Sequence, residues 1–395
     1  MSLALLGGGE TSPWIDRIWI ATDGSDDTGD GSEGNPLLNL NTAINWASAG
    51  NIIMVKGGTY TPASLLNVYK SDLTIMAVWG ARPVFDATNY PTDGEGGFND
   101  RVMRLQGVDN VTLQGFDLTN GPDGGLQIIG TCSGIRVNAV NAYQNGRTSL
   151  YEGEGFVADG AISDLWYTNC DSYENFDELG DVGLNADGFK ISTTGTGCGY
   201  TYCRAWRNSD DGFDCYNSSQ SSSVTVEPVT YEHCWSFENG ILAGGSDSAG
   251  DGNGFKLGGQ RTGLGNGSGG NTLLNSLAWG NREVGITDNS CTVANTVTYN
   301  TGYNNQRINI EGGSLAHTIQ ANVALVAGES NISIADTTNV SGNSWQLVGA
   351  STSDFVSTDD TTARGSRDAD GNMPVSDFLR PVSGSVIDGI GGVPT

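Results

Sequence analysis

The sequence predicts an all-β protein, a right-handed parallel β-helix in which the chain winds as a solenoid behind an N-terminal capping helix. Three observations support this fold: a phrase ending in asparagine repeats along the chain, turn-forming residues are abundant, and residues 18–60 follow the order strand, loop, helix, strand. We expect one domain over residues 1–395. Its cap and first coil would occupy about 14–60, its coils about 61–350, and a tail packed on the outside about 351–395.

Composition favours many short strands joined by turns. The 395-residue chain contains 59 glycines and 10 prolines and is rich in Asn, Thr and Ser, which are the residues that turns prefer. A solenoid buries its apolar surface between neighbouring coils and needs no single large core. The composition therefore agrees with a solenoid.

Residues 18–60 have the order expected at the start of a parallel β-helix. A strand near Ile18 leads into an acidic, glycine-rich loop over 23–34, an amphipathic helix is predicted over about 41–49, and a second strand follows over 52–55. A helix across the open end of the first coil would shield edge backbone groups that otherwise invite aggregation. We interpret this helix as the cap.

The repeat emerges beyond residue 105 as a strand, an inward residue, an aromatic residue and an asparagine. The asparagines are 19 to 42 residues apart, an interval that fits solenoid coils with loops of variable length. They are Asn120, Asn145, Asn175, Asn208, Asn239, Asn281 and Asn300. The aromatics two positions before an asparagine are Tyr143, Tyr173, Trp206, Phe237 and Trp279. We expect both sets to stack as structural residues, although the aromatics are also attractive as sugar platforms.

Charge and histidine content exclude several functions. A formal charge of −27 opposes binding to nucleic acid or to anionic membranes, because both need a basic surface. The two histidines, His233 and His317, leave too little for a zinc site built from several histidines or for a Ser-His-Asp triad. The first residues lack a basic region and a long apolar run, so neither a secretion signal nor a membrane span is visible.

Seven cysteines are neither dense enough for a disulfide framework nor spaced as a zinc ribbon. Cys170, Cys203 and Cys234 each stand five residues before a repeat asparagine. This spacing favours stacked, buried thiols, with disulfides as the alternative.

Four carboxylates gather where the repeat is most regular. Asp187 precedes the segment with Asp210, Asp211 and Asp214, and the two phrases align at Asp-Gly-Phe without a gap. Equivalent residues of successive coils stack about 4.8 Å apart, so we expect Asp187 beneath Asp211. So many anions in one place need a hard cation with oxygen ligands, and calcium fits best. A structural calcium site and solvated turn aspartates are the alternatives.

The next coil adds a lysine to the same face. The phrase Asn-Gly-Phe-Lys places Asn253 over Asp211 and Lys256 over Asp214. Lys190 is a rival, because it follows Asp-Gly-Phe and would stack on the other side of Asp214. We expect Lys256 to act as the base.

Further cations are candidates for contact with the carboxylates of a substrate. They are Lys190, Arg261, Arg282 and Arg307. A guanidinium fork matches a carboxylate bidentately. The longest insertions, over 244–254 and 259–270, are rich in Gly, Ser and Asn, and loops that lengthen on one face of a solenoid usually line its binding groove.

These phrases resemble the family-nine polysaccharide lyases, whose members are chiefly calcium-dependent pectate lyases with a right-handed parallel β-helix. The resemblance covers most of the chain, and its specific part lies in residues 185–189, 204–214, 252–259 and 285–289. It implies that the four aspartates are calcium ligands and that Lys256, in preference to Lys190, is the catalytic base.

The chemistry of elimination agrees with that implication. β-Elimination in a uronate chain begins with removal of a weakly acidic proton next to a carboxylate, whose charge calcium would neutralise. An ordinary lysine has a pKa of about 10.4. A nearby dication and burial lower this pKa and the aspartates raise it, so we expect an alkaline activity optimum.

The sequence thus predicts a calcium-dependent lyase that cleaves polygalacturonate (pectate) or a related acidic polysaccharide such as rhamnogalacturonan. A uronan C5-epimerase, which begins with the same proton abstraction, is one alternative. A non-catalytic, calcium-stabilised adhesin or tail-fibre module is another. We expect a secreted or cell-surface monomer whose partner is an acidic polysaccharide.

Overall fold

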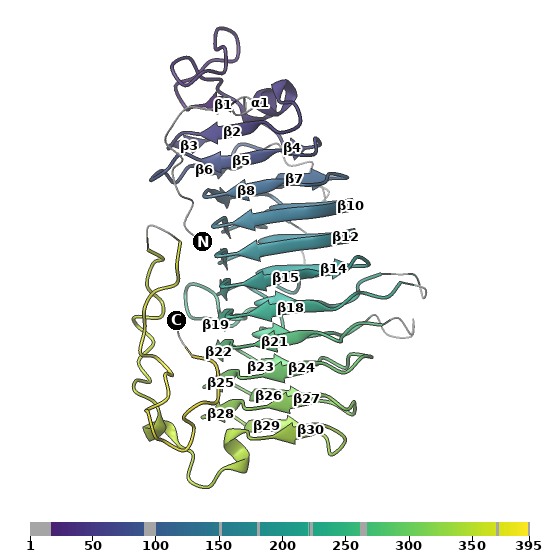
Figure 1. Cartoon of the computed structure of the whole chain (residues 1–395), viewed down its shortest axis with the longest axis vertical. Helices are drawn as coiled ribbons and strands as arrows, with labels where there is room; N and C mark the ends of the chain where they lie inside the picture. The colour runs from purple at the N-terminus through teal and green to yellow at the C-terminus, as the bar shows by residue number, and fades with distance from the viewer. Residues whose placement is uncertain are drawn as a thin grey trace, which may run out of the picture.

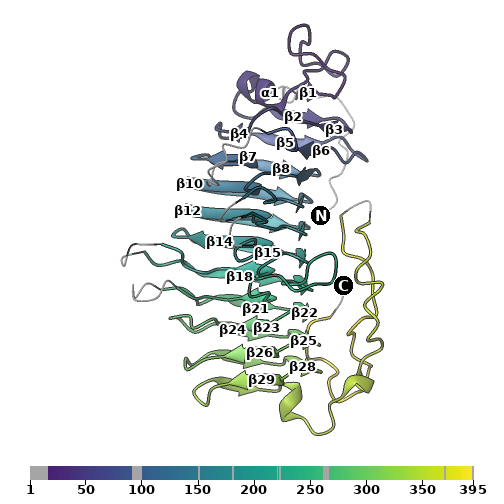
Figure 2. The ribbon, with the colours of Figure 1, turned by 180° about the vertical axis from the view of Figure 1, so that it is seen from behind.

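The chain winds into a long parallel β-helix (Figure 1, and from behind in Figure 2). Each coil contributes three short strands, and each strand pairs in parallel with its equivalents in the neighbouring coils. The strands therefore form three columns, named here column 1, column 2 and column 3 in the order of the chain within a coil. The structure is a computed structural model, and the residues that it describes are 17–90, 100–149, 152–179, 182–219, 221, 224–260, 267–368 and 371–393.

Column 1 consists of β4 (Leu66–Val68), β7 (Arg101–Gln106), β14 (Phe189–Thr193), β17 (Phe213–Asp214), β20 (Phe255–Lys256), β23 (Val284–Thr287), β26 (Ile308–Gly312) and β29 (Ser330–Ile334). Two long strands, β10 (Gly124–Asn138) and β12 (Phe156–Thr168), pass from column 1 into column 2 without a break.

Column 2 consists of β1 (Arg17–Ile20), β2 (Ile52–Val55), β5 (Thr74–Ala77), β8 (Thr112–Gln114), β15 (Cys198–Thr201), β18 (Val229–Glu232), β21 (Thr272–Leu274), β24 (Thr296–Thr298), β27 (Thr318–Gln320) and β30 (Asn339–Ser341). Column 3 is a separate ten-stranded sheet. It consists of β3 (Thr59–Tyr60), β6 (Val84–Asp86), β9 (Asp117–Thr119), β11 (Asn141–Tyr143), β13 (Asp171–Tyr173), β16 (Arg204–Trp206), β19 (Trp235–Phe237), β22 (Leu277–Trp279), β25 (Thr301–Tyr303) and β28 (Val323–Leu325).

The interior is a column of stacked aromatic rings. Phe156, Phe189, Phe213 and Phe255 occupy the same position of successive coils, and their ring centroids are 4.8–4.9 Å apart. All four side chains are fully buried. Each stacked pair contributes about 0.5–1.5 kcal/mol beyond its buried area, so this column holds the coils of column 1 in register.

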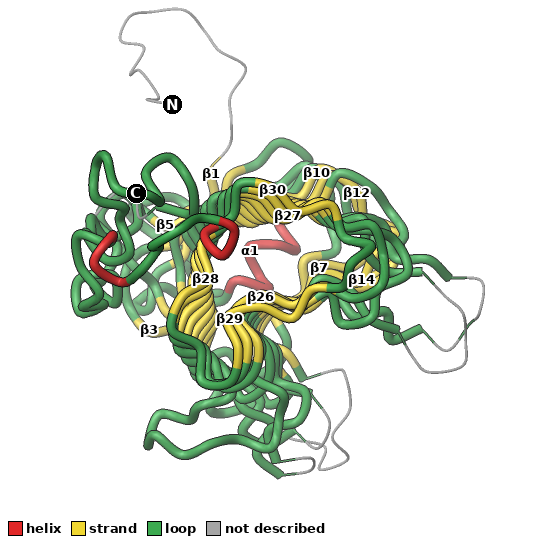
Figure 3. Tube along the Cα trace, turned by 90° about the horizontal axis from the view of Figure 1, so that it is seen from below, coloured by secondary structure: helices red, strands yellow, loops and turns green. Residues whose placement is uncertain are grey.

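The N-terminal helix is confirmed, but it is shorter than the sequence predicts. α1 (Leu40–Trp46) buries Leu40, Ala43 and Ile44. It ends at Trp46 because Ala47 adopts an extended backbone conformation. Viewed along the long axis, α1 lies across the interior enclosed by the three columns (Figure 3).

The asparagine ladder is confirmed for five of the seven predicted members. The amide of each member donates to the next along the series Asn145, Asn175, Asn208, Asn239 and Asn281, at 2.8–3.0 Å. The prediction is wrong for Asn120 and Asn300. Asn120 donates to Asp86 instead, and Asn300 belongs to a second ladder with Asn322 and Asn343, because its turn joins column 2 to column 3.

The predicted aromatic stack is confirmed, with neighbouring centroids 4.3–5.4 Å apart from Tyr143 to Trp279. Because the rings cover one another, they serve the fold. All seven cysteines are buried and free, as the spacing of Cys170, Cys203 and Cys234 suggests. Burial raises the pKa of the Cys170 and Cys203 thiols.

After β30 the chain turns back and runs alongside column 3 (Figure 1). This tail contains the short helices η1 (Ser344–Gln346) and η2 (Thr352–Asp354). The Phe378 ring lies edge-on to Trp279, with centroids 5.0 Å apart, and Arg367 binds Asp171 at 2.7 Å. Among the described residues, no helix is both long and apolar enough to cross a membrane.

Candidate active site

Strand register brings the predicted residues together on the outer face of column 1. Lys190 pairs with Asp214, and Asp214 pairs with Lys256, as the alignment of the repeats predicts. In the preceding turn, the amide of Asp211 donates to Asp187 Oδ1 at 3.1 Å, and the amide of Asn253 donates to Asp211 Oδ1 at 2.6 Å. Two adjacent rows of polar side chains therefore run along the solenoid.

Three of the four predicted metal ligands converge closely. Asp187, Asp210 and Asp211 each offer a carboxylate oxygen, and these oxygens lie within 4.8 Å of one another. All three residues are buried, and burial together with the charges of neighbouring aspartates raises the pKa of each carboxyl. The cluster carries more negative charge than its surroundings stabilise. A hard divalent cation with oxygen ligands fits this donor set.

Asp214 lies beside that cluster, between the two lysines. Its Oδ2 is 3.5 Å from the Lys190 Nζ, and its Oδ1 is 4.0 Å from the Lys256 Nζ. The backbone N–H of Tyr216 also donates to Asp214 Oδ1, at 2.8 Å. Its carboxylate is thus shared between the lysines and the edge of the cluster.

Lys256 forms the closest ion pair of the site. Its Nζ lies 2.8 Å from Asp211 Oδ2 and 5.6 Å from the centre of the Tyr216 ring. The side chain is 12% exposed, so the amine is reachable from the groove. Burial by itself lowers the pKa of Lys256, but the charges of Asp211 and its neighbours outweigh burial and hold that pKa above its ordinary value. Lys256 is therefore an ammonium while the aspartates have no other counter-ion.

Lys190 is placed differently. Its Nζ lies 3.5 Å from Asp214, 3.7 Å from Asp187 and 4.0 Å from Glu154, without a pair as short as that of Lys256. The surrounding carboxylates raise its pKa despite burial. Its charge is spread over three carboxylates.

Sequence analysis missed the continuation of the aspartate row by Glu154. Arg101, whose side chain is fully buried, binds Glu154 at 2.8 Å and Glu152 at 2.9 Å. Gly124 occupies the intervening coil, where a Cβ would lie 2.0 Å from Arg101 Nη1. The missed signal was the phrase Glu-Gly-Phe at 154–156, which repeats Asp-Gly-Phe of the next two coils.

The arginines proposed as substrate contacts are not gathered at the cluster. Arg261 lies outside the described residues. Arg282 donates to the carbonyl of Gly250, next to Asp251, whose amide binds Asp210 Oδ1 at 2.6 Å. Arg307 pairs with Glu283 at 3.0 Å and with Glu329 at 3.6 Å. Arg282 is thus one loop away from the cluster, whereas glutamates occupy Arg307.

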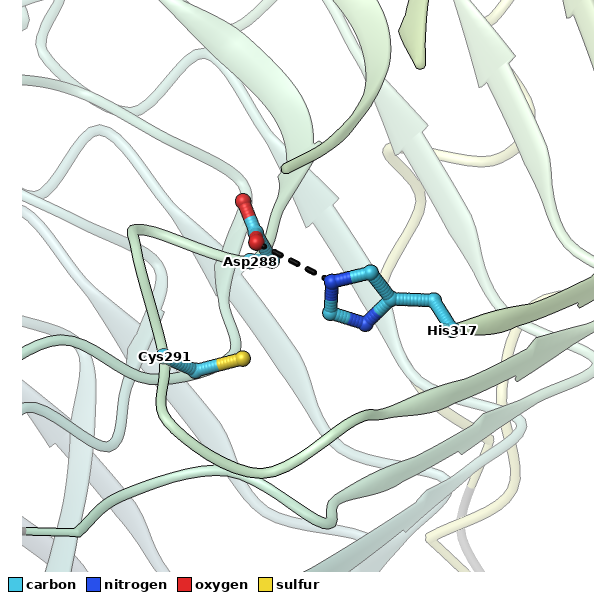
Figure 4. A group of neighbouring side chains, drawn as sticks. All are labelled: Asp288, Cys291 and His317. Atoms are coloured by element: carbon cyan, nitrogen blue, oxygen red, sulfur yellow. Dashed lines mark hydrogen bonds and ion pairs between the residues drawn. The ribbon is translucent and has the colours of Figure 1, made fainter. Parts of the chain in front are cut away.

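A second group, Asp288, Cys291 and His317, also has its potential ligand atoms within 4.8 Å (Figure 4). The amide of Asn295 donates to His317 Nδ1 at 3.0 Å, so His317 Nε2 carries the proton and donates to Asp288 at 3.1 Å. The Cys291 thiol donates to the Val293 carbonyl, and burial and the charge of Asp288 raise its pKa to about 12. The group is satisfied internally and offers no free ligand.

Comparison with known proteins places the chain in a family. Residues 18–322 match the family model described as the Pel9A-like, right-handed β-helix region. Pectate lyase PEL9 of Emericella nidulans is 31% identical over 396 residues, which are 94% of this chain and 93% of the relative. Pectate lyase L of Dickeya dadantii is 32% identical over 383 residues, 92% of this chain and 83% of the relative.

Solved structures agree with this match. The crystal structure of pectate lyase Pel9A superposes with a TM-score of 0.79 at 28% identity, covering 94% of this chain and 90% of that chain. A rhamnogalacturonan lyase superposes with a TM-score of 0.74 at 23% identity, covering 93% and 96%, and this likeness concerns the fold. The chain therefore belongs to the Pel9A-like right-handed β-helix family and is a polysaccharide lyase of family nine.

Proposed function

We propose that this lyase cleaves pectate by β-elimination, that calcium is held by the aspartate cluster, and that Lys256 is the base. Relatives named pectate lyases, which this chain matches over most of its length, support the substrate. The observation that carries the proposal is the lysine amine 2.8 Å from a cluster of buried carboxylates with raised pKa values. No role is assigned there to the Asp288 group.

The aspartates fit the metal. Asp187, Asp210 and Asp211 would supply the converging oxygens, and Asp214 would join them by leaving its lysine partners. Bound calcium supplies positive charge that neutralises a substrate carboxylate and makes the neighbouring C–H more acidic.

Lys256 removes the proton. Engagement of Asp211 by a cation takes away the counter-charge of the lysine, and this loss favours the neutral amine. The Nζ lone pair accepts the proton from C5 of the uronate, the C4–O bond to the leaving sugar breaks, and a C4–C5 double bond remains. The Tyr216 ring beside the ammonium keeps Lys256 oriented toward the groove. We expect activity to rise toward alkaline pH.

Lys190 supports the cluster from the other side. Its ammonium balances Glu154, Asp187 and Asp214, so it holds these carboxylates in place when substrate enters. Arg282, which lies on the rim near Gly250, is the better of the two described arginines for contact with a substrate carboxylate.

The decisive experiment measures the ultraviolet absorbance of unsaturated uronate products from polygalacturonate at alkaline pH. Wild type and Lys256→Ala are compared with added calcium and with a chelator. We expect absorbance to rise only for wild type with calcium. Equal product from Lys256→Ala would refute the assigned base, and absence of product from every uronan would refute the lyase and favour an epimerase or a binding module.

Two expectations accompany this proposal. A polymeric uronan is met outside the cell, so we expect the protein to be secreted or held at the cell surface. We also expect a monomer, which size-exclusion chromatography with light scattering would test.

A further inference from the structure

A second cavity lies on another face of the molecule, between the tail and column 3. Its volume is about 650 Å³. Residues 77–82 and strands β13 and β16 form one wall, and tail residues 364–368 form the other. The end-on view shows the tail beside β28 and β3, away from β7 and β14 of column 1 (Figure 3). We call it the tail cavity.

The charges of the tail cavity are opposite to those of the chain as a whole. The chain has a net charge of −27 and only 18 basic residues. Four of these basic residues line the tail cavity, together with two aspartates. The four are Arg82, Arg204, Arg364 and Arg367. An anion repelled by most of the surface therefore meets positive charge here.

Two of these arginines have donors to offer. The side chains of Arg82 and Arg364 are 39% and 32% exposed. Arg364 binds Glu238 and Asp360 through Nη2, and among the described residues its Nε and Nη1 have no hydrogen-bond partner. By contrast, Arg204 and Arg367 are buried against Asp171. The first pair supplies forks for a carboxylate, and the second pair builds the wall.

The tail cavity also has groups suited to a sugar. Trp79, on the turn between β5 and β6, lines the cavity and is 87% exposed. Unlike the stacked aromatics of column 3, its ring faces are open. Gln114 and Asn138, which pair in register, add amides to the same wall. An apolar ring face with nearby amides is a combination that binds the C–H face and the hydroxyls of a sugar.

We propose that the tail cavity is an accessory site that binds a segment of acidic polysaccharide away from the catalytic groove. Arg82 and Arg364 would hold uronate carboxylates, and Trp79 would pack against a sugar ring. A site of this kind keeps the polymer on the enzyme between cleavage events. The identity of the polymer rests on the proposed function, whereas the recognition of a uronate chain rests on the residues of the cavity.

The test measures binding of saturated galacturonate oligomers to the full chain in chelator, by calorimetry, so that calcium-dependent binding in the groove is suppressed. Trp79→Ala is compared with Trp46→Ala, a tryptophan of α1 that is 49% exposed and does not line the cavity. We expect Trp79→Ala to weaken binding at least about fivefold, as for an anchoring tryptophan. Trp46→Ala should bind as wild type does, and added salt should weaken wild-type binding.

Equal affinity of Trp79→Ala and wild type would overturn the proposal, and so would equally tight binding of neutral galactan oligomers. Arg364→Gln serves as a second variant, with the same loss expected. Cleavage of short oligomers should be unchanged in Trp79→Ala, because they need no second point of attachment. If no uronan is cleaved, the proposed function fails, but the binding comparison still decides the fate of the accessory site.

Discussion

Two buried charge networks on different faces of this solenoid are balanced in opposite ways. On column 1, Asp187, Asp210 and Asp211 crowd together, and the pKa of each carboxyl is raised. On column 3, Asp171 lies 2.7 Å from both Arg204 and Arg367. Although burial opposes it, the charges of these two arginines lower the pKa of Asp171 to about 2.

The difference separates a functional network from a structural one. A carboxylate cluster with a deficit of positive charge costs stability unless a ligand supplies that charge, and such a deficit is typical of a site built for a cation. The Asp171 network is complete within the chain, and it joins coils to a tail segment almost two hundred residues later. The first network is expected to govern activity and the second stability.

The largest expected effect concerns activity. In saturating calcium, Lys256→Ala should lower kcat by about 10²–10⁴-fold, the usual contribution of a general base. Lys190→Ala is the matched control, and its loss should be smaller because Lys190 makes no pair as short as 2.8 Å. Initial rates of unsaturated product formation check this. A larger loss in Lys190→Ala would exchange the roles of the two lysines.

The next effect concerns stability. Asp171→Ala leaves two buried arginines without their shared carboxylate, and removal of one partner of a buried ion pair typically costs about 3–5 kcal/mol. Urea denaturation should show a lower midpoint, while kcat on polygalacturonate stays near that of wild type at a temperature where both are folded. An equal effect on kcat would break the division between the two networks.

Metal removal sharpens the comparison from the other side. Calcium at about a hundredfold excess over its Kd should stabilise the wild type by about 2.7 kcal/mol. In Asp210→Asn the calcium-free protein should be more stable than wild type, because a buried charge repelled by Asp211 is gone, and the response to calcium should shrink. Thermal melts with calcium and with chelator measure both changes. A full calcium response in Asp210→Asn would place the metal elsewhere.

The pH dependence is the smallest effect. Asp171 has a folded pKa of about 2, below the unfolded value of about 3.9. Its contribution is therefore present above about pH 4 and is lost as the pH falls through 2; it amounts to about 2.6 kcal/mol for such a pair of pKa values. Urea midpoints of wild type and Asp171→Asn should converge between pH 4 and pH 2. A gap that persists at pH 2 would mean that Asp171 acts through packing.

Much of the site is predictable from the repeats. Asp187 stacks under Asp211, and Lys256 stacks over Asp214, because every coil returns the chain to the same register. The same rule would have found Glu154, had Glu-Gly-Phe been aligned with Asp-Gly-Phe. Asn300 escaped the rule because asparagines occur at two corners of the coil, and a short phrase does not say which corner it occupies.

What the sequence by itself determined is everything that follows from periodicity: the parallel β-helix, the capping helix, the aromatic and asparagine stacks, and the row of carboxylates beside a lysine. Only the tertiary structure decided the contacts without a period. Arg101 reaches Glu154 across Gly124, and Arg367 of the tail returns to Asp171. Periodic contacts depend on local repeats that any aligned phrase displays, whereas these depend on loop lengths and on the path of the tail in space.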